Sequence, residues 1–308
     1  MSFEFNPTAV ESVNQESIED SGLRFPGIIF FGGDMTKRPK KNQPDPGISW
    51  RGGFFISKEN LPNEDLSQCG WTEDSFISQS SGKEVEGWYK PSITIMHIAR
   101  RRHWRVGEAK TAQYFAWPNW KEAKATGLHM SGRMQSIVIV QGLEHLGPLC
   151  LSLAGHAQMS FCGESGYEQS GALALHRRIV VQKANEVTKE KTPKGVAAKK
   201  WDHYAFWLTV GAATDANGDP KFTEVGTKAK SSIVLPVPIG IPATPAEVNL
   251  NDWYVGPALL AEAANILAML AAEGWKEAWA NNSSAESTEQ KAPVKATVEA
   301  NYAEEAGV

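Results

Sequence analysis

Short apolar runs bounded by glycine and proline recur along this chain, and they restrict its fold to a mainly β class. Trp201–Val210 is the longest run, and its aromatic and β-branched content is typical of a strand. Ser232–Ile241 has similar content, but Pro236 and Pro238 restrict it to a sheet edge or an extended segment. The other runs that predict strands are Phe25–Phe31, Gly53–Ser57, Ile93–Ile98, Ile137–Val140 and Leu149–Leu153. We therefore expect a mainly β (α+β) protein with an OB-like barrel or β-sandwich core.

A segment near the C-terminus has the period of a helix. Gly256 is suited to cap this helix, and Pro257 is suited to its first position. The apolar residues recur at helical spacing and form one stripe, which consists of Leu259, Ala263, Ile266, Leu267 and Leu270. We expect an amphipathic C-terminal helix within residues 256–280.

Charge is distributed unevenly, with two acidic ends around a basic middle. The net charge is −5 over residues 1–36, +8 over 37–230 and −7 over 231–308. A basic region of this kind is the electrostatic signature of a protein that binds a polyanion. Composition predicts four segments, which are an acidic N-terminal segment (1–22), a β-rich basic core domain (23–255), the helix (256–280) and a disordered acidic tail (281–308).

The cysteines and the N-terminus indicate a compartment. Cys69, Cys150 and Cys162 are too few for a disulfide framework, so they favour a reducing environment. The N-terminus lacks the apolar stretch of a signal peptide, and no window approaches the roughly 18 apolar residues of a membrane span. We expect a cytoplasmic protein that has no membrane partner.

Catalytic and cofactor motifs are not recognisable in the sequence. It has no P-loop and no dinucleotide fingerprint, and Ser165 lacks the second glycine of a nucleophile elbow. Cys150, His156 and Cys162 have an unusual spacing for zinc ligands, and a fourth ligand is not evident. A hydrolase or nuclease would need paired carboxylates, which the sequence does not suggest. We expect no enzymatic activity, no cofactor and no metal.

The densest basic cluster is the run RRRHWR at residues 100–105. If the strand from Ile93 continues through it, alternate residues share a face, with Arg100, Arg102 and Trp104 on one side and Arg101, His103 and Arg105 on the other. We expect neither row to lie in the core, because an unpaired buried charge is costly. Phosphate fits the planar guanidinium fork. The alternative is a solvated strand end, or a loop paired with local acids.

Four aromatic residues lie close together just after this cluster, and two lysines follow them. The six residues are Tyr114, Phe115, Trp117, Trp120, Lys121 and Lys124. Proteins that bind single-stranded nucleic acid stack bases on such rings while neighbouring cations follow the backbone. The alternative is a hydrophobic loop packed on the core or on a partner.

Residues 184–200 carry five lysines and two glutamates, with one proline and one glycine. This composition predicts a flexible basic hairpin tip that leads into Trp201 through Lys199 and Lys200. The tip either clamps a nucleic-acid strand or is a plain solvated loop.

Two resemblances follow from these patterns. The first rests on the motifs Phe25-Pro26, Gly52–Ile56, Glu59-Asn60, Gly70-Trp71, Ser81-Gly82 and Gly87. With these motifs, residues 23–213 resemble a bacterial family of unknown function that is common on plasmids and mobile elements. The layout of a β-rich basic core and an acidic tail resembles phage and plasmid single-stranded DNA-binding proteins. Unlike those proteins, this chain ends in Ala-Gly-Val without a terminal aromatic residue.

We therefore expect a sequence-tolerant single-stranded DNA-binding protein that acts in replication or recombination of a mobile element. The expected contacts to phosphates and bases are Arg100, Arg101, Arg102, Trp104, Arg105, Tyr114, Trp117, Trp120, Lys121, Lys124, Lys199, Lys200 and Trp201. Further expected partners are other copies of the chain, and replication or recombination proteins bound by the tail. The alternative is a structural protein that assembles through its basic middle and acidic ends.

Overall fold

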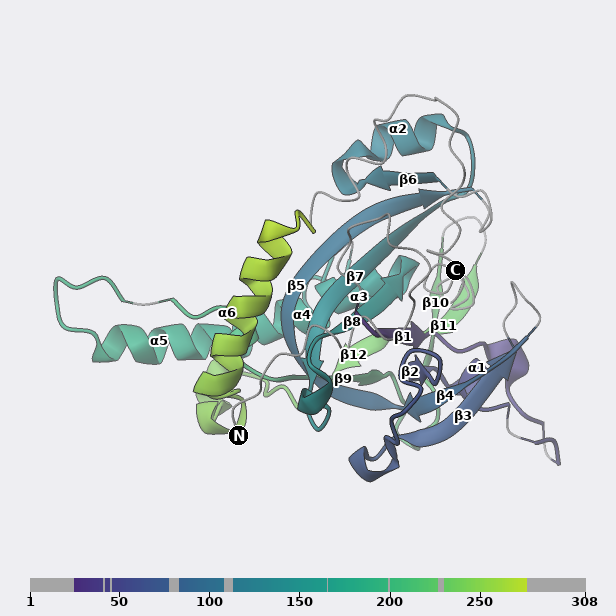
Figure 1. The fold of residues 1–308 in the computed structure, drawn as a ribbon, viewed down its shortest axis with the longest axis horizontal. Coiled ribbons are helices and arrows are strands. Elements are labelled where there is room, and N and C mark those ends of the chain that lie inside the picture. Colours follow the sequence, from purple (N-terminus) through teal and green to yellow (C-terminus); the bar gives the residue numbers. More distant parts are fainter. Residues whose placement is uncertain are drawn as a thin grey trace.

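The computed structural model describes residues 25–275, apart from residues 41, 45, 78–82, 108–112, 165, 199 and 227–229. The predicted N-terminal segment (1–22) and the predicted acidic tail (281–308) lie outside the described residues. The described part forms a ten-stranded mixed sheet with helices against it and a separate two-stranded sheet (Figure 1). The prediction of a mainly β protein is confirmed.

One strand order runs across the large sheet. In space the order is β12 (Pro236–Pro238), β9 (Leu208–Ala212), β5 (Ser92–Val106), β7 (Met130–Val140), β8 (Leu149–Ala154), β1 (Gly27–Phe31), β2 (Gly53–Ser57), β4 (Glu84–Lys90) and β3 (Thr72–Ile77), with β6 (Gln113–Ala116) paired to β5. Neighbouring strands are antiparallel except β1 and β8, which run parallel with Ile28 opposite Leu151. The two-stranded sheet consists of β10 (Phe222–Val225) and β11 (Ser231–Val234).

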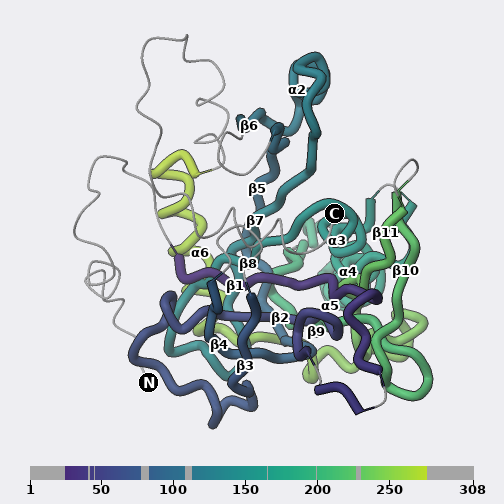
Figure 2. The backbone as a smooth tube through the Cα atoms, turned by 90° about the vertical axis from the view of Figure 1, so that its right-hand side faces the viewer, coloured from purple at the N-terminus to yellow at the C-terminus, as the bar shows by residue number. Residues whose placement is uncertain are grey.

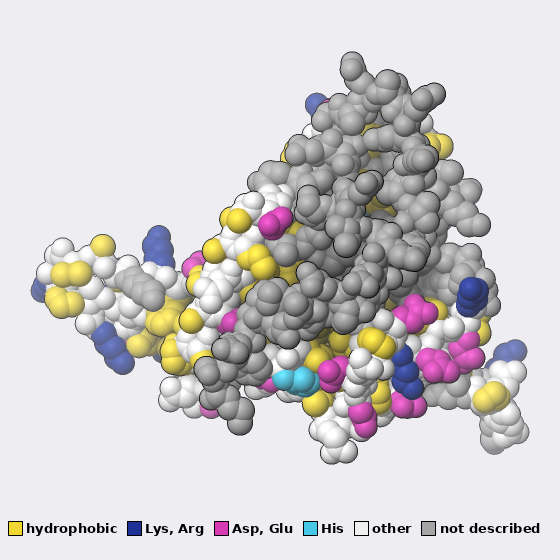
Figure 3. Space-filling model, in the orientation of Figure 1, with side chains coloured by type: hydrophobic (Ala, Val, Ile, Leu, Met, Phe, Trp, Pro, Cys, Tyr) yellow, Lys and Arg dark blue, Asp and Glu magenta, His cyan; other side chains and the backbone are white. Residues whose placement is uncertain are grey.

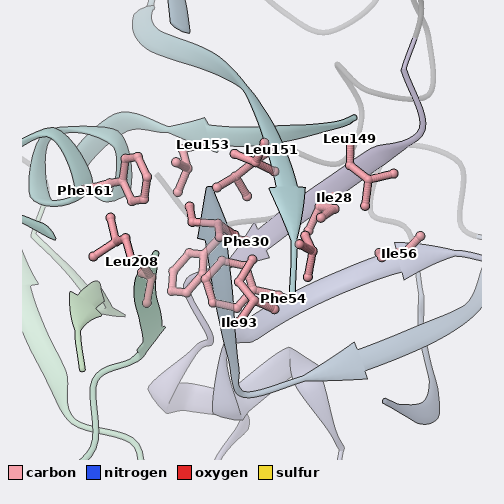
Figure 4. Close-up of a cluster of buried hydrophobic side chains, with 14 of the residues drawn as sticks. Ile28, Phe30, Phe54, Ile56, Ile93, Leu149, Leu151, Leu153, Phe161 and Leu208 are labelled. Atoms are coloured by element: carbon pink, nitrogen blue, oxygen red, sulfur yellow. The ribbon is translucent and has the colours of Figure 1, made fainter. Parts of the chain in front are cut away.

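The sheet curls strongly but does not close. Phe30 of β1 and Phe54 of β2 lie beside Ile93 of β5, although three strands separate β2 from β5 in the order (Figure 4). The order nevertheless ends at β12 and β3, so the sheet is not a closed barrel, and of the expected OB-like barrel or β-sandwich core only the mainly β class is confirmed. Pro236 and Pro238 explain one open edge, because proline has no N–H to donate to a further strand. The prediction that these prolines mark an edge is confirmed.

Helices pack on the sheet and extend beyond it. The α-helices are α1 (Ile48–Arg51), α2 (Trp120–Ala125), α3 (Gly155–Cys162), α4 (Ala172–His176), α5 (Gln182–Lys191) and α6 (Pro257–Ala272). A π turn at Arg177–Val181 joins α4 to α5 as one continuous helix. The short 3-10 turns are Met35–Lys37, Ser67–Cys69, Trp117–Asn119, Glu144–Leu146, His203–Ala205, Pro245–Glu247 and Leu250–Asp252.

Two apolar clusters cover opposite faces of β5 and β7. On the concave face, Ile95 and Val138 join Phe161 of α3 in the largest cluster. On the other face, Met96 and Ile137 pack with the apolar stripe of α6, whose buried residues are Ala263, Ile266 and Leu270. The predicted C-terminal helix is confirmed, and it begins at Pro257 as expected.

Two predicted elements are wrong. The expected strand Trp201–Val210 forms only from Leu208, because Trp201 and Phe206 pack against α4 and α5 instead of continuing the sheet. The expected flexible hairpin at 184–200 is helical up to Lys191. Ala184 is buried in the same cluster as Phe206, and this contact anchors the first turn of α5.

An arm projects from the sheet where β5 and β7 run past their neighbours. β9 pairs with β5 only at Ser92–Ile95, and β8 pairs with β7 only at Arg133–Val138. We call the part beyond these pairings, residues 99–106 and 113–132, the arm. It contains β6, the Trp117–Asn119 turn and α2, and its end with β6 and α2 projects beyond the sheet in Figures 1 and 2.

Candidate nucleic-acid interface

The arginine run lies in the last half of β5, so its side chains alternate between the two faces as predicted. Arg100, Arg102 and Trp104 face α3, and the Nη1 atom of Arg100 donates to the Cys162 Sγ at 2.8 Å. Arg100 Nη2 lies 3.6 Å from one oxygen of Glu164, and Arg102 is paired with the other oxygen. This row therefore has internal partners within the protein.

Trp104 and Trp117 contact each other by stacking and by a hydrogen bond. Their rings stack with centroids 4.1 Å apart, and the Nε1 atom of Trp104 donates to the Trp117 carbonyl oxygen at 2.9 Å. The guanidinium carbon of Arg102 lies 4.3 Å from the Trp117 ring centroid. Gly132 makes room for this stack, since a Cβ there would lie 3.2 Å from the Trp117 ring. Both indoles are half-buried and belong to the packing of the arm.

The second arginine row faces α6. Arg101 donates through Nε and Nη2 to the Gln135 Oε1 at 2.9 and 2.7 Å, and through Nη1 to the Trp275 carbonyl oxygen at 3.0 Å. Its guanidinium carbon also lies 4.6 Å from the Trp275 ring centroid. Arg101 thus ties the arm to the end of α6.

The expectation that neither row enters the core is wrong for His103 and Arg105, which are 3% and 4% exposed. Burial, and then the neighbouring guanidinium groups led by Arg101, hold the pKa of His103 well below its usual range. His103 is therefore a neutral imidazole, which lowers the charge that this face must accommodate. The row is tolerated because a guanidinium with hydrogen-bond partners, such as Arg101, costs far less to bury than a bare charge.

The end of the arm carries the exposed part of the predicted set. Trp120 is 45% exposed at the start of α2. The ammonium groups of Lys121 and Lys124 each lie 5.9 Å from its ring centroid, and both lysines are exposed. Tyr114 lies deeper in β6, half-buried, with its ring 5.1 Å from that of His103. We call Trp120, Lys121 and Lys124 the arm tip.

Two of the remaining predicted residues, Lys200 and Trp201, follow α5 in the chain, and α5 projects away from the arm tip (Figure 1). Lys200 is exposed, and Lys199 lies outside the described residues. Trp201 is half-buried, and its Nε1 donates to the Thr188 Oγ1 at 2.8 Å. Lysines gather along the projecting α5 and the loop after it, where Figure 3 shows dark-blue side chains, and the exposed ones there are Lys189, Lys191 and Lys194. The structure therefore divides the predicted set between two separate surfaces.

A network of hydrogen bonds that the sequence does not predict crosses from β7 to the π turn. Arg177 Nη2 lies 3.4 Å from the His203 Nδ1, His203 Nε2 lies 2.9 Å from the His97 Nδ1, and His97 Nε2 lies 3.1 Å from the Ser136 Oγ. Because arginine only donates, Nδ1 of His203 accepts, and each neutral imidazole then donates onward to the next group. Ser136 is fully buried, so its hydroxyl cannot meet a substrate, and the chain of bonds instead fixes the orientation of His203. No sequence signal links these residues, which lie on separate elements.

His97 and His203 of this hydrogen-bond network, and the nearby His176, have lowered pKa values. Burial, followed by the charges of Arg177 and Arg100, lowers the pKa of His203 to about 4. Burial, and then repulsion from His203, holds the pKa of His97 well below its usual range. Burial is also the main cause that lowers the pKa of His176 to about 3, and its Nε2 lies 3.1 Å from the Trp207 carbonyl oxygen. Positive charge in this region therefore resides on arginine.

In comparisons with known proteins, no family model, no curated protein and no solved structure matches this chain. Among the described residues no group of three His, Cys, Asp or Glu side chains is arranged to hold a metal ion. The described helices are also too short or too polar to cross a bilayer. The resemblance to a plasmid-borne family stays a prediction.

Proposed function

We propose that this protein binds single-stranded nucleic acid, without strong sequence preference, through the arm tip. A base stacks on the exposed face of Trp120, and Lys121 and Lys124 contact the adjoining phosphates. Stacking is sequence-tolerant because every base has a π face, and lysine contacts to phosphate carry no sequence information. Single-stranded DNA is the form that we expect, in keeping with the resemblance to phage and plasmid DNA-binding proteins.

The exposure of Trp120 is the observation that carries this proposal. It is the only tryptophan among the described residues with more than about a third of its surface exposed. A large aromatic ring at the end of a projecting arm gains nothing from the core, so its place there favours a role in binding. The two ammonium groups beside it supply the positive charge that a phosphate backbone needs.

The arginine run has a supporting part in this proposal. Arg100, Arg101 and Arg102 have partners within the chain, so they contribute a positive field along the arm rather than free guanidinium groups at its end. A field of this kind speeds association with a polyanion. Trp104 and Trp117 hold the arm rigid, and rigidity lowers the entropy that is lost on binding.

The test is a titration of the full chain with a fluorescently labelled single-stranded oligonucleotide at low salt. Trp120→Ala should weaken binding by roughly 5- to 150-fold, which corresponds to the 1–3 kcal/mol of one stacked base. Leu128→Ala is the matched control, since Leu128 is an apolar side chain on the same arm that is 58% exposed and has no ring. Equal losses in both variants, or no binding by the folded wild-type protein, contradict the proposal.

A second candidate function is self-assembly through the same arm. Trp120 and Leu128 are both exposed apolar side chains of the arm, and exposed apolar side chains also suit a protein contact. In that case sedimentation would show a mass that rises with protein concentration. Trp120→Ala and Leu128→Ala would both reduce that mass, whereas stacking on DNA depends on Trp120 alone.

A further inference from the structure

Three arginines and a single carboxylate lie on β5, on the segment after α3 and on the π turn. His203 joins the π turn to β5, since it contacts Arg177 at 3.4 Å and His97 at 2.9 Å. Arg100 and Arg102 come from β5, Arg177 begins the π turn, and Glu164 follows α3. Glu164 pairs closely with Arg102 and reaches Arg100 only at 3.6 Å. One carboxylate for three guanidinium groups leaves a local excess of two positive charges.

Arg177 is the least compensated member of this group. Within the described part of the chain, no carboxylate oxygen lies within 4.0 Å of its nitrogens, and its partner is the neutral His203 at 3.4 Å. Burial, and then the charge of Arg100, lower the pKa of Arg177, which indicates that the two guanidinium groups act on each other. Arg177 is nevertheless exposed, so a solute can reach it. Arg177 is thus repelled by a neighbouring guanidinium group and is accessible to solutes.

The surroundings hold Arg177 and Arg100 in place. A π turn contains an additional residue per turn, which changes where its side chains point, and such turns are frequent at functional sites. His203 is oriented by His97, and Arg100 is held by the Cys162 Sγ at 2.8 Å. Burial raises the pKa of the Cys162 thiol, so this sulfur is a neutral partner and does not cancel the charge of Arg100.

We propose that Arg100 and Arg177 form a binding site for a phosphoryl dianion, the terminal group of a phosphate monoester or free phosphate, with His203 holding Arg177 in position. A dianion matches the local excess of two charges, whereas a phosphodiester carries only one charge. Guanidinium groups present paired donors that suit phosphate oxygens. The site lies away from the arm tip and does not depend on the function proposed for the tip.

The titratable and charged groups that act on this site come from each neighbouring element, and His97 and His176 among them are buried. They are Arg100, Arg102 and His97 of β5, Cys162 and Glu164 at the end of α3, His176 and Arg177 of the α4–π segment, and His203 of the 3-10 turn. Glu164 is the only acid among them. Its pairing with Arg102 keeps it from competing for Arg177.

The test uses inorganic phosphate with the full chain at constant ionic strength and mildly alkaline pH, where the dianion predominates. Calorimetry should show saturable binding, and the imidazole NMR signals of His203 and His97 should shift with the same midpoint. Arg177→Gln should weaken binding at least tenfold. Arg178→Gln is the matched control, since Arg178 is the adjacent exposed arginine, loses the same charge and bonds to the Gln169 carbonyl oxygen at 3.0 Å. It should change binding less than twofold.

Two further measurements identify the source of the phosphate and distinguish this site from the arm tip. Tighter binding of a 5′-phosphorylated oligonucleotide than of its 5′-hydroxyl form points to the end of a nucleic-acid strand, and equal binding points to a free phosphate compound. Trp120→Ala should leave phosphate binding unchanged. Equal weakening by Arg177→Gln and Arg178→Gln, or no saturable binding of phosphate by the wild-type protein, overturns the proposal whatever the outcome with DNA.

Discussion

Trp104 and Trp117 stack with their ring planes only 8° apart, and this pair joins β5 to the turn that precedes α2. Two of the tryptophans that the sequence suggested for base stacking are therefore already stacked on each other. Their contact stiffens the arm, and Trp120 remains as the ring that faces solvent. Because Trp117 is packed and Trp120 is exposed, we expect their substitution to affect stability differently.

Trp117→Ala should destabilise the protein by about 2–4 kcal/mol, because it removes a half-buried ring, its stacking partner and the surface beneath Arg102. Trp120→Ala should change the free energy of unfolding by less than about 0.5 kcal/mol, as expected of an exposed side chain. Urea unfolding followed by circular dichroism measures both. Similar losses in the two variants would show that Trp120 is also a packing residue.

Replacing Lys121 and Lys124 together with Gln should lower the salt dependence of binding to single-stranded DNA. Each phosphate contact releases roughly 0.7 of a counterion on a single strand, so the slope of log K against log salt should become less steep by about 1.4. The matched control replaces Lys189 and Lys191 of α5, an exposed pair with the same total charge. If the α5 pair changes the slope and the arm pair does not, the strand binds along α5.

Gly171→Ala should destabilise the protein by about 3 kcal/mol, at the upper end of the cost of overpacking. The φ angle of Gly171 is −65°, which any residue adopts, but a Cβ there would lie 2.1 Å from the Cα of Gly163. Backbone atoms cannot rotate away, so α3 and α4 must separate. Gly127→Ala, at φ +69° with open space around it, should cost only the roughly 1–2 kcal/mol of left-handed backbone strain. Thermal or urea unfolding compares the two variants.

Stability should fall as the pH drops from 6.5 toward 5. The folded protein lowers the pKa of His176 to about 3 and that of His203 to about 4, so the unfolded chain binds more protons in this range. The free energy of unfolding therefore rises with pH, by up to about 1.4 kcal/mol per pH unit for each such histidine, with the partly exposed His203 giving the smaller share. Urea unfolding at several pH values measures the slope, which His176→Gln should reduce. A slope that the variant leaves unchanged would place the titrating groups elsewhere.

The strands were predictable where a short apolar run lies between turn residues. Gly53–Ser57 matches β2 in full, and the run at 149–153 matches all but one residue of β8. The strand predicted over 201–210 was wrong in its first part. Aromatic residues occur both in strands and in segments that pack on helices, and the two cannot be distinguished when the rings are not periodic. The helices of residues 155–191 were missed for a related reason, since α3 is buried nearly all round and shows no polar face.

The site was predictable in composition but not in pairing. The alternation of residues 100–105 followed from strand geometry and is confirmed. The partners of those arginines were not predictable, because Glu164 and Trp275 reach them only through the tertiary fold. For the same reason, nothing in the sequence linked Arg177 to His203.

The parallel pairing of β1 with β8 has a consequence for the growing chain. The strand that contains Ile28 lacks its second neighbour until the strand that contains Leu151 has been synthesised. At a ribosomal rate of roughly 5–20 residues per second, the β8-facing edge of β1 stays bare for several seconds after β1 and β2 can pair. That edge belongs to a fully buried strand of sequence GIIFF, which is an adhesive segment on a nascent chain. The edge is unpaired until residue 154 has emerged from the ribosome. A slow codon stretch or a chaperone that acts before that point would therefore affect the yield of folded protein.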